Sequence, residues 1–481
     1  MAFRDLRAYI EKLEAEGELI KVGTEVDAHL EIGAITRRAC ERRAPAPLFE
    51  NIKGYPGHRM AGVLMGPSKP ALHSRIAIAL GLDKTTPPLA LIEHVRERFR
   101  SPENPTLTSN ADAPCKEVIL GGDEANLMSL PNPWIKEIDG GKYVGTWDIV
   151  VTKDPDSGWT NWGVYRCMVK DDKSFAILLL PGSQHGGSIF NKYELRGKPM
   201  PLALVIGADP LSQLAAITSC PSGVSEAGLA GGLMGESPLL VKCETSDLQV
   251  PASAEIVIEA EIGPGERTEE GPFGEYTGHT AHRGLTPLAR VKCITHRKNP
   301  IFTMANMGKP WDDSAPALSI LQSVLAKDRL EAHGVPVKSV YYHSPSTAVV
   351  VSINSRPGVA KKVVSVLTSG HRVVIGPGIV IVDEDVDVTD LEDVWWAITT
   401  RMHPDRYEVF RGVSANPLIP FLTPEERANR ETSLWIMDAT FPTGWSPEYR
   451  KTHTQVADFK NAWSDEVQRK VIERWTEYGY E

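Results

Sequence analysis

The segment Tyr143–Leu180 reads YVGTWDIVVTKDPDSGWTNWGVYRCMVKDDKSFAILLL and contains three short runs rich in β-branched, aromatic and aliphatic residues. These runs are Tyr143–Thr152, Asn161–Val169 and Phe175–Leu180, and polar, glycine- or aspartate-containing turns separate them. Runs of this length and composition, bounded by such turns, are typical of β-strands. The segment therefore predicts the beginning of a sheet domain built from many short strands.

The same pattern continues toward the C-terminus as far as Ala305. Six further runs have strand-like composition: Leu202–Ile206, Leu214–Ser219, Leu239–Glu244, Ala254–Ile262, Leu288–Ile294 and Ile301–Met304. Short strands at this spacing, separated by Gly, Pro and Asp, favour a barrel or a sandwich. Two helical inserts are expected within the domain, near Ser188–Arg196 and Ser225–Met234.

The N-terminal flank has a different pattern, in which helical periodicity alternates with short strand candidates. The expected helices are Arg4–Glu16, Leu30–Arg42, Ala71–Leu82 and Leu89–Phe99, and the expected strands are Glu18–Val22 and His58–Val63. A Pro- and Asn-rich connector, residues 101–113, follows these elements. This flank is predicted to be a small α/β cap.

The C-terminal flank begins with Ala315–Ala332, which is apolar at helical spacing and is predicted to be a helix between domains. The expected elements after it alternate as in an α/β domain: strand Ser339–Ile353, helix Val359–Ser369, strand Ile379–Val382 and helix Asp390–Thr400. A last helix, Ser464–Tyr478, follows a loop-rich stretch. Its apolar positions at Val467, Val471 and Trp475 favour ordinary core packing over a subunit interface.

A chain of 481 residues is too long for one hydrophobic core, so several domains are expected. We predict an α/β (α+β) protein in four parts. They are an N-terminal α/β cap (1–112), a β-rich domain (113–312), a linking helix (313–332) and a C-terminal α/β domain that ends in a helix (333–481).

Composition excludes several classes of protein. Apolar residues make up 42% and charged residues 24%, as in ordinary globular proteins, and the net charge of −10 argues against a nucleic-acid partner. No stretch approaches the ~20 apolar residues that a membrane span needs, and the first twenty residues lack the apolar core of a secretory signal. The six cysteines form no CxxC pair, which predicts reduced thiols and a cytoplasmic location.

The most informative local string is EGPFGE, Glu270–Glu275. Two carboxylates five positions apart, with Gly and Pro between them, cannot share a regular strand or helix face, so this string is a shaped loop. If both acids meet in one cavity, repulsion and desolvation raise at least one pKa and provide a proton donor at neutral pH. A solvated acidic turn would also explain the string taken alone.

Three other strings offer ligands for a metal or an anion. Asn161 begins NWGVYR, which ends in Arg166; His185 follows a buried strand; and Glu226 begins a helix that Ser225 would cap. On a flat strand Asn161 and Arg166 would point to opposite faces, so a bulge near Gly163 would be needed to unite them. An amide, an imidazole and a carboxylate suit Mn2+ or Mg2+ better than zinc, and such an ion usually shares its shell with a phosphate.

Taken together, these strings resemble the UbiD-like decarboxylases, and most closely the ferulic/cinnamic acid decarboxylase branch. The similarity extends over nearly the whole chain. The matching strings are DGGKYVGTWDIVV (139–151), TNWGVYRCMV (160–169), GSQH (182–185), GVSEAGLAGGLMG (223–235), LVKCETSDLQVPASAEIVIE (240–259), EGPFGE (270–275), VDEDVDV with WAITTRM (382–402) and NPLIPF (416–421).

The resemblance implies a split-barrel-like flavin domain that binds prenylated FMN through Mn2+ (or Mg2+) and K+. It implies a carboxy-lyase that removes CO2 reversibly from an aromatic, heteroaromatic or acrylic acid through a covalent flavin adduct. The implied catalytic residues are Arg166, Glu270 and the proton donor Glu275. The implied cofactor-binding residues are Asn161, Trp162, Gly163, Val164, Tyr165, Arg166, Gln184, His185 and Glu226. The implied Mn2+ ligands are Asn161, His185 and Glu226, and the implied K+ neighbours are Trp162, Ile217, Thr218, Cys220 and Glu226.

The chain departs from the ferulic acid branch around the expected substrate pocket, at Tyr276, Asn416 and Leu418, so the acid is left open. A flavin prenyltransferase as cofactor supplier and a homodimer or higher homo-oligomer are also expected. Two alternative functions remain: a flavin-dependent reductase on the same fold, and a flavin-free metal-binding or scaffold protein. Neither requires Arg166 together with two glutamates.

Overall fold

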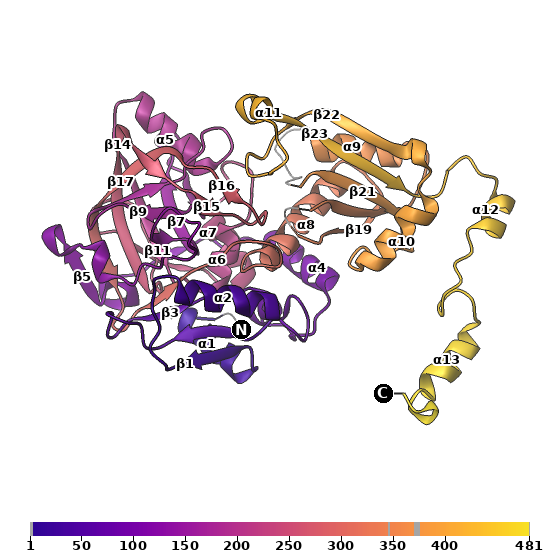
Figure 1. Cartoon of the computed structure of the whole chain (residues 1–481), viewed down its shortest axis with the longest axis horizontal. Coiled ribbons are helices and arrows are strands. Elements are labelled where there is room, and N and C mark those ends of the chain that lie inside the picture. Colours follow the sequence, from indigo (N-terminus) through magenta and orange to yellow (C-terminus); the bar gives the residue numbers. More distant parts are fainter. Residues whose placement is uncertain (1–2, 345–346, 370–375, 481) are drawn as a thin grey trace.

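The computed structural model describes residues 3–344, 347–369 and 376–480, and everything below concerns these residues. The N-terminal part packs helices on a small sheet, as predicted (Figure 1). The helices are α1 (Leu6–Ala15), α2 (Glu31–Arg42), α3 (Ser74–Ala79) and α4 (Pro88–Phe99). The sheet has the order β1 (Leu19–Val22), β2 (Ala46–Phe49), β3 (Arg59–Ala61), β18 (Ile301–Thr303). Strand β18 is distant in sequence, so the N-terminal sheet is completed by the chain that leaves the central domain.

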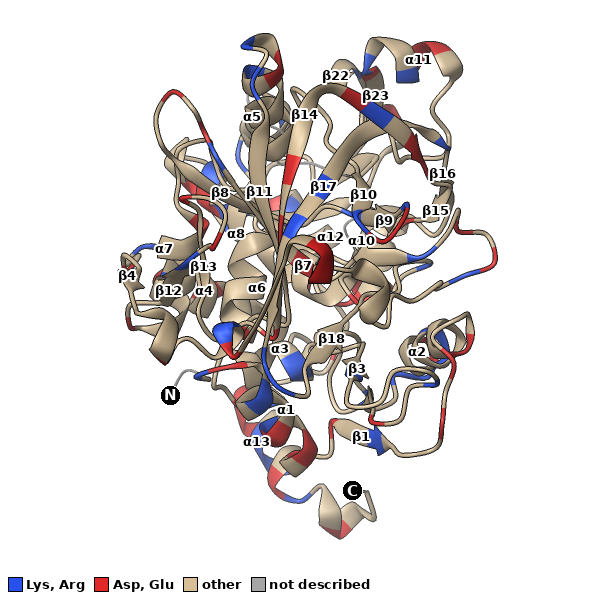
Figure 2. Ribbon diagram, turned by 90° about the vertical axis from the view of Figure 1, so that its left-hand side faces the viewer, with Lys and Arg blue, Asp and Glu red and all other residues tan. Residues whose placement is uncertain are grey.

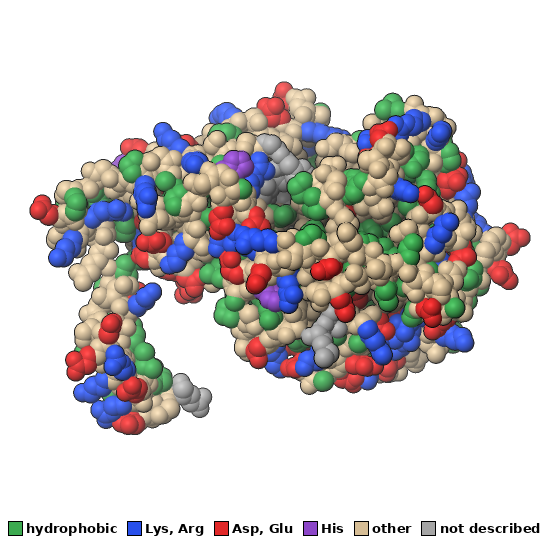
Figure 3. All heavy atoms as spheres, turned by 180° about the vertical axis from the view of Figure 1, so that it is seen from behind, with side chains coloured by type: hydrophobic (Ala, Val, Ile, Leu, Met, Phe, Trp, Pro, Cys, Tyr) green, Lys and Arg blue, Asp and Glu red, His purple; other side chains and the backbone are tan. Residues whose placement is uncertain are grey.

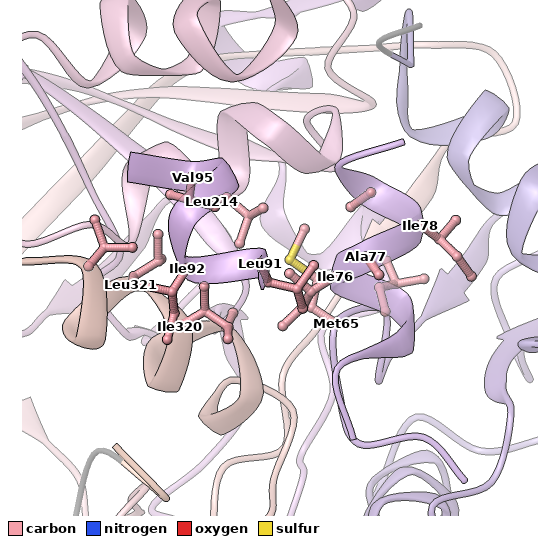
Figure 4. Packing of buried hydrophobic residues seen from close by; sticks show 14 of the residues in the cluster. Met65, Ile76, Ala77, Ile78, Leu91, Ile92, Val95, Leu214, Ile320 and Leu321 are labelled. Atoms are coloured by element: carbon pink, nitrogen blue, oxygen red, sulfur yellow. The ribbon is translucent and has the colours of Figure 1, made fainter. Parts of the chain in front are cut away.

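The N-terminal helices share a core with two elements from later in the chain. Met65, Ile76, Leu91, Leu214 and Leu321 belong to one cluster of buried apolar side chains (Figure 4). They come from the N-terminal part, from α6 (Pro210–Ala216) and from α8 (Ala315–Ala332). Because burying one such side chain contributes about 1.5–3 kcal/mol, this shared cluster fixes the N-terminal part against the central domain.

The central domain is a strongly twisted nine-stranded half-barrel sheet, as the pattern of short strands predicted. Its order is β6 (Tyr143–Gly145), β9 (Cys167–Val169), β10 (Ser174–Ile177), β17 (Gly284–His296), β14 (Ile256–Glu270), β11 (Met200–Ile206), β7 (Asp148–Lys153), β8 (Thr160–Gly163), and β5 (Val118–Gly121) pairs with β17. Small sheets beside it contain β4 (Thr106–Leu107), β12 (Leu239–Lys242) and β13 (Gln249–Pro251), and separately β15 (Phe273–Gly274) and β16 (Thr280–Ala281).

The predicted strand Asn161–Val169 is two strands rather than one. β8 and β9 are consecutive in the chain but lie near opposite ends of the sheet, so Val164–Arg166 crosses the open side of the half-barrel. The parity conflict between Asn161 and Arg166 therefore does not arise, because the regular strand ends at Gly163. The crossing places residues from both ends of the sheet around one space.

Both helical inserts are confirmed, as α5 (His185–Leu195) and α7 (Glu226–Met234). The predicted strand Leu214–Ser219 is wrong, because its first three residues end helix α6. Asp209 caps this helix by accepting hydrogen bonds from the backbone of Leu211 and Ser212, and Pro210 occupies its first turn. In the sequence, a short and fully buried helix has the same continuous apolar run as a buried strand. Periodicity alone therefore does not distinguish the two.

The C-terminal domain begins after α8, whose bounds are those predicted. Its sheet has the order β19 (Val337–Tyr342), β20 (Val349–Ile353), β21 (Gly378–Asp383), β23 (Glu431–Ala439), β22 (Tyr407–Ser414). Helices α9 (Val359–Thr368), α10 (Leu391–Arg401) and α11 (Pro424–Asn429) accompany it. The single strand predicted at 339–353 is a hairpin, with residues 345–346 outside the described part. Strands β22 and β23 fall in the stretch that looked loop-rich.

Residues 441–480 form an extended arm that carries α12 (Pro447–His453) and α13 (Asp465–Glu473) (Figure 1, Figure 3). The sequence predicted core packing for the helix at 464–478. Within the described chain this prediction is wrong, because no residue of α13 is buried. Val467 is 42% exposed, Ile472 63% and Trp475 43%. The amphipathic pattern is real, but no part of the same described chain covers its apolar side.

The surface bears both signs of charge, interspersed along the ribbon rather than gathered in a basic stripe (Figure 2). Among the described residues, no helix combines the length and the apolar character that a membrane-crossing segment needs. All six cysteines are buried and unpaired with one another.

Candidate active site

A cavity of about 320 Å³ opens where the crossing segment, α5, α6, α7 and the C-terminal domain meet. This volume lies at the lower end of the range usual for small-molecule sites. Nearly all the residues singled out from the sequence line it: Asn161, Trp162, Gly163, Val164, Tyr165, Arg166, Gln184, His185, Ile217, Thr218, Cys220, Glu226, Glu275, Tyr276 and Leu418. Glu270 and Asn416 do not line it, and each instead contacts a residue that does.

The centre of the site is Arg166, whose guanidinium binds both glutamates of the EGPFGE string. Nη2 lies 2.6 Å from Oε2 of Glu270, and Nη1 pairs with Oε1 of Glu275. Tyr143 donates its hydroxyl to the other oxygen of Glu270 at 2.8 Å. All four side chains are buried or nearly so. The two carboxylates therefore converge through one arginine, and the reading of the string as a solvated acidic turn is wrong.

The loop between the glutamates owes its shape to close backbone packing. Gly271 has a φ of 83°, and a Cβ there would lie 3.0 Å from the carbonyl oxygen of His282. The preceding β14 ends at Glu270, and the short pair β15–β16 begins at Phe273. The chain therefore turns sharply between the two acids, which brings Glu275 back toward the arginine that Glu270 already holds.

Burial changes the protonation of this group. Burial raises the pKa of Glu275 above its ordinary value, although the charge and hydrogen bond of Arg166 oppose the rise. Burial alone would lower the pKa of Arg166. The negative charges of Glu275 and Glu270 outweigh this effect and raise the pKa of the guanidinium. Burial also raises the pKa of Tyr143, beside Glu270. A charged arginine thus faces a carboxyl group whose pKa is raised by burial, which favours a role as proton donor.

Asn161 and Glu226 meet at the other end of the cavity. Asn161 Nδ2 donates to Oε1 of Glu226 at 2.9 Å, and the backbone N–H of Trp162 donates to Oε2 at 3.1 Å. Burial raises the pKa of Glu226, and no ion pair to it occurs in the described part of the chain. A buried carboxylate beside an amide oxygen and an imidazole is a donor set that fits a divalent cation.

His185, the third ligand expected from the sequence, lies in the first turn of α5 and lines the same cavity. Its ring lies 5.1 Å from the ring of Trp159, edge to face. Within the described residues no group of three or more His, Cys, Asp and Glu side chains is placed to hold a metal. The set here has two such residues and one amide, so an ion would need further oxygen ligands from water or a phosphate.

Two helices begin at the cavity, α5 at His185 and α7 at Glu226. Helix N-termini direct free backbone N–H groups and positive partial charge outward, which favours an anionic group such as a phosphate. Ser225 caps α7 as predicted, by accepting a hydrogen bond from Gly228 N at 3.1 Å. The indole Nε1 of Trp162 and the Nε of Arg166 are buried without hydrogen-bond acceptors in the described chain. Unpaired donors of this kind fit a polar cofactor.

The residues expected from the sequence as K+ neighbours line the cavity near Glu226. Ile217, Thr218 and Cys220 follow directly after α6, and the thiol of Cys220 lies 3.2 Å from Oε1 of Glu226. Burial, with the adjacent Glu226, raises the pKa of Cys220, so this thiol stays protonated. Backbone carbonyls at the end of a short helix are suitable ligands for a large monovalent cation.

The C-terminal domain closes the opposite end. Leu418 lines the cavity, and Asn416 donates to the Tyr276 hydroxyl at 2.5 Å. A second bridge runs from Arg430 to the carbonyl oxygen of Pro181 at 2.9 Å. Sequence reasoning missed these lining residues: Thr146, Trp147, Leu178, Ala216, Phe273, Met307, Ser314 and Leu318. Thr146, Trp147 and Phe273 lie inside quoted strings, whereas Met307, Ser314 and Leu318 carried no signal.

Three family models match the chain in sequence order. They describe the N-terminal, Rift-related and C-terminal domains of 3-octaprenyl-4-hydroxybenzoate carboxy-lyase (UbiD), and they match residues 10–98, 106–310 and 317–439. Together they account for most of the described residues outside the C-terminal arm. The site built above lies largely within the second of these matches.

Individual relatives agree with the family models. The chain is 34% identical to the pyrrole-2-carboxylic acid decarboxylase of Pseudomonas aeruginosa, over 99% of this chain and 98% of the relative. It is 31% identical to ferulic acid decarboxylase 1 of Saccharomyces cerevisiae, with the same coverage. The UbiD-class enzyme HmfF of Pelotomaculum thermopropionicum, solved as an evolved dimeric form with prFMN, superposes with a TM-score of 0.77 at 30% identity, covering 92% of this chain and 96% of that one.

Proposed function

Because the chain belongs to the UbiD family of carboxy-lyases, we propose that it removes CO2 reversibly from an aromatic, heteroaromatic or α,β-unsaturated carboxylic acid. Prenylated FMN is the proposed cofactor and Glu275 the proposed proton donor. The observation that carries the proposal is the pairing of one buried arginine with two glutamates at a cavity. Family membership also decides against the reductase and the scaffold protein considered from the sequence.

The chemistry explains why each group is needed. Loss of CO2 from an sp2 carbon leaves an electron pair that the substrate alone cannot stabilise, and the prenylated flavin, when bound, supplies an electron sink for covalent catalysis. Arg166 orients the substrate carboxylate and holds Glu270 in an ion pair at 2.6 Å. Glu275 then delivers a proton to the carbon that has lost CO2. Phe273, Met307 and Leu318 limit the access of water around that carbon.

We propose Asn161, His185 and Glu226 as ligands of Mn2+ (or Mg2+), through which the flavin phosphate is held. The N-terminus of α5 would support the same phosphate. The proposed K+ neighbours are Trp162, Ile217, Thr218, Cys220 and Glu226. The support is the buried carboxylate of Glu226, whose pKa burial raises and which a nearby cation would stabilise as the charged form.

The test uses protein co-expressed with a flavin prenyltransferase, which we propose as the supplier of the cofactor. We expect bound flavin in the absorbance spectrum, a divalent metal by elemental analysis, and CO2 release from at least one acid in a panel of aryl, heteroaryl and acrylic acids. A purified protein without flavin that releases no CO2 from any of these acids would refute the proposed function.

The substrate-facing end favours a polar ring. Tyr276 and Leu418 line the cavity, and Asn416 acts on it through its hydrogen bond to Tyr276. We propose that this pair holds a hydroxyl of Tyr276 toward the substrate, which suits a heteroaromatic or hydroxylated acid better than an unsubstituted cinnamate. Relative turnover of pyrrole-, furan- and phenyl-type acids measures this preference.

We propose a homodimer or a higher homo-oligomer, on the evidence of the arm. Nine of the 24 exposed large apolar side chains of the described chain lie within residues 441–480, and seven more lie on the C-terminal domain between Leu391 and Phe421. A concentration of exposed large apolar side chains in one region favours an association site. Light scattering should give a multimer for the full chain and a smaller species after truncation at residue 440; a monomeric full chain would contradict the proposal.

The domain boundaries and the location complete the proposal. The division into parts 1–112, 113–312, 313–332 and 333–481 stays a prediction that limited proteolysis can test. A cytoplasmic location is supported by six buried thiols without a disulfide among them.

A further inference from the structure

Lys136 lies in the turn between Trp134 and Gly140, and its side chain packs against Gly274, the residue before the proposed proton donor. Its Nζ is buried and donates no hydrogen bond to another described atom. The carboxylate of Asp139 is 3.8 Å away, too far for a hydrogen bond. Buried ammonium groups are rare unless paired. Within the described chain the one ion pair of Lys136 is this 3.8 Å contact with Asp139, so the buried ammonium is only weakly compensated.

Phe273 connects this lysine to the catalytic arginine. Lys136 Nζ lies 5.1 Å from the centre of the Phe273 ring, and Arg166 Cζ lies 5.2 Å from the same centre. The ring thus stabilises two cations at once. Phe273 stands between Glu270 and Glu275 in the chain, so both cations act on the same loop.

The loop between Glu270 and Glu275 also leaves space for the Lys136 side chain. A Cβ at Gly274 would lie 3.1–3.2 Å from Cδ, Cε and Nζ of Lys136, closer than ordinary side-chain contacts. Asp139 holds the two segments together, since its carboxylate accepts from Gly274 N at 2.9 Å and from Lys136 N at 3.1 Å. The residue before Glu275 is therefore a glycine that lets the lysine approach.

We infer that Lys136 is a positioning residue whose ammonium sets the readiness of Glu275 to release its proton. The inference rests on the proposed role of Glu275. Lys136 is not itself a lining residue of the cavity and reaches it only through Phe273, so it acts through the loop and through its charge. If Arg166 turns to the substrate carboxylate, Lys136 remains as the positive charge beside Glu275.

The charges around both groups agree with this role. The charged groups that act on Glu275 are Arg166, Glu270 and Lys136. Those that act on Lys136 are Asp139, Asp312, Glu275 and Arg37. Burial lowers the pKa of Lys136 while its three carboxylate neighbours oppose the change. Removing the ammonium removes a cation that lowers the pKa of Glu275, so the carboxyl would hold its proton more tightly.

The test compares the holoenzymes Lys136→Met and Lys136→Arg with wild type. Because Glu275 must be protonated to act, the alkaline limb of the pH–rate profile marks its titration. Lys136→Met should move this limb upward by about one pH unit and lower the plateau about threefold, because a weaker acid donates less readily. Lys136→Arg should restore both. Lys170→Met, which removes an exposed lysine that donates to the Glu269 carbonyl, should leave the profile unchanged.

A second readout does not depend on turnover. The carboxylic-acid C=O stretching band of Glu275, identified by its loss in Glu275→Gln, is followed by infrared titration of wild type and Lys136→Met. A midpoint that rises in Lys136→Met supports the inference, and an unchanged or lowered midpoint overturns it. An unchanged alkaline limb, or an arginine variant that behaves like the methionine variant, also overturns it. Absence of turnover in wild type refutes the proposed function, and the infrared midpoint then decides the inference separately.

Discussion

Replacing Glu275 with glutamine keeps the size of the side chain and removes its transferable proton. The amide oxygen can still accept from Arg166, and Arg166 keeps its 2.6 Å contact with Glu270, so we expect the fold, the flavin and the metal to be retained. General acid catalysis contributes about 10²–10⁴-fold to a rate. The expected loss is in the upper part of this range, because Glu270 does not line the cavity and cannot replace the donor.

A loss of about 10³–10⁴-fold corresponds to about 4–5.5 kcal/mol in the activation free energy. The assay is CO2 release in D2O together with the deuterium content of the product, which follows protonation of the carbon directly. Absorbance of the flavin and metal content serve as occupancy controls. Glu266→Gln is the matched control, since Glu266 forms only an exposed pair with Arg290 at 2.9 Å, worth ~0–1 kcal/mol in stability. Near-normal turnover of Glu275→Gln, with full occupancy, would refute the assignment of the proton donor.

Three further predictions follow from other parts of the structure. His185→Ala should lower metal and flavin content at least severalfold, whereas His94→Ala, on α4, should not; equal content in both variants, by elemental analysis and absorbance, would argue against the metal site. Asn416→Leu removes the amide that donates to the Tyr276 hydroxyl and should shift relative turnover by about tenfold from hydroxylated or heteroaromatic acids toward phenyl acids, and an unchanged ratio would exclude the pair from specificity. Burial raises the pKa of Asp148 well above its ordinary value, so the stability that its protonated form contributes is present at low pH and lost as pH rises through the folded pKa. Asp148→Asn should therefore raise the Tm more at pH 8 than at pH 5, by about 1 kcal/mol or more in unfolding free energy. Equal shifts at both pH values would contradict this.

Helices with local stop signals could be predicted well. The bounds of α8 match the prediction because an apolar periodic run is closed by His333-Gly334, and those signals lie in the chain itself. β22 was missed because six of its eight residues in succession are exposed, so it shows no alternation. As an edge strand it pairs only with β23, and partners of that kind are not visible locally.

The residues of the candidate site could be predicted from short sequence motifs. Their arrangement in space could not. That Glu270 and Glu275 share a cavity was a hypothesis from one loop, whereas their arginine comes from a segment 104 and 109 residues away. Tyr143 and Lys136 were not proposed, since neither has a local pattern that sets it apart from an ordinary core tyrosine or surface lysine. Such contacts depend on the register of the whole sheet.

Arg166 stands on a crossing between two strands at opposite ends of the half-barrel, so the entire sheet sets its place. Tyr276 and Asn416, by contrast, come from a loop and from the C-terminal domain. If the proposed roles hold, the residues that carry the reaction and those that select the acid come from different parts of the chain. Libraries randomised at the second set should explore new acids while the reaction centre stays intact, which makes this enzyme a favourable starting point for directed evolution.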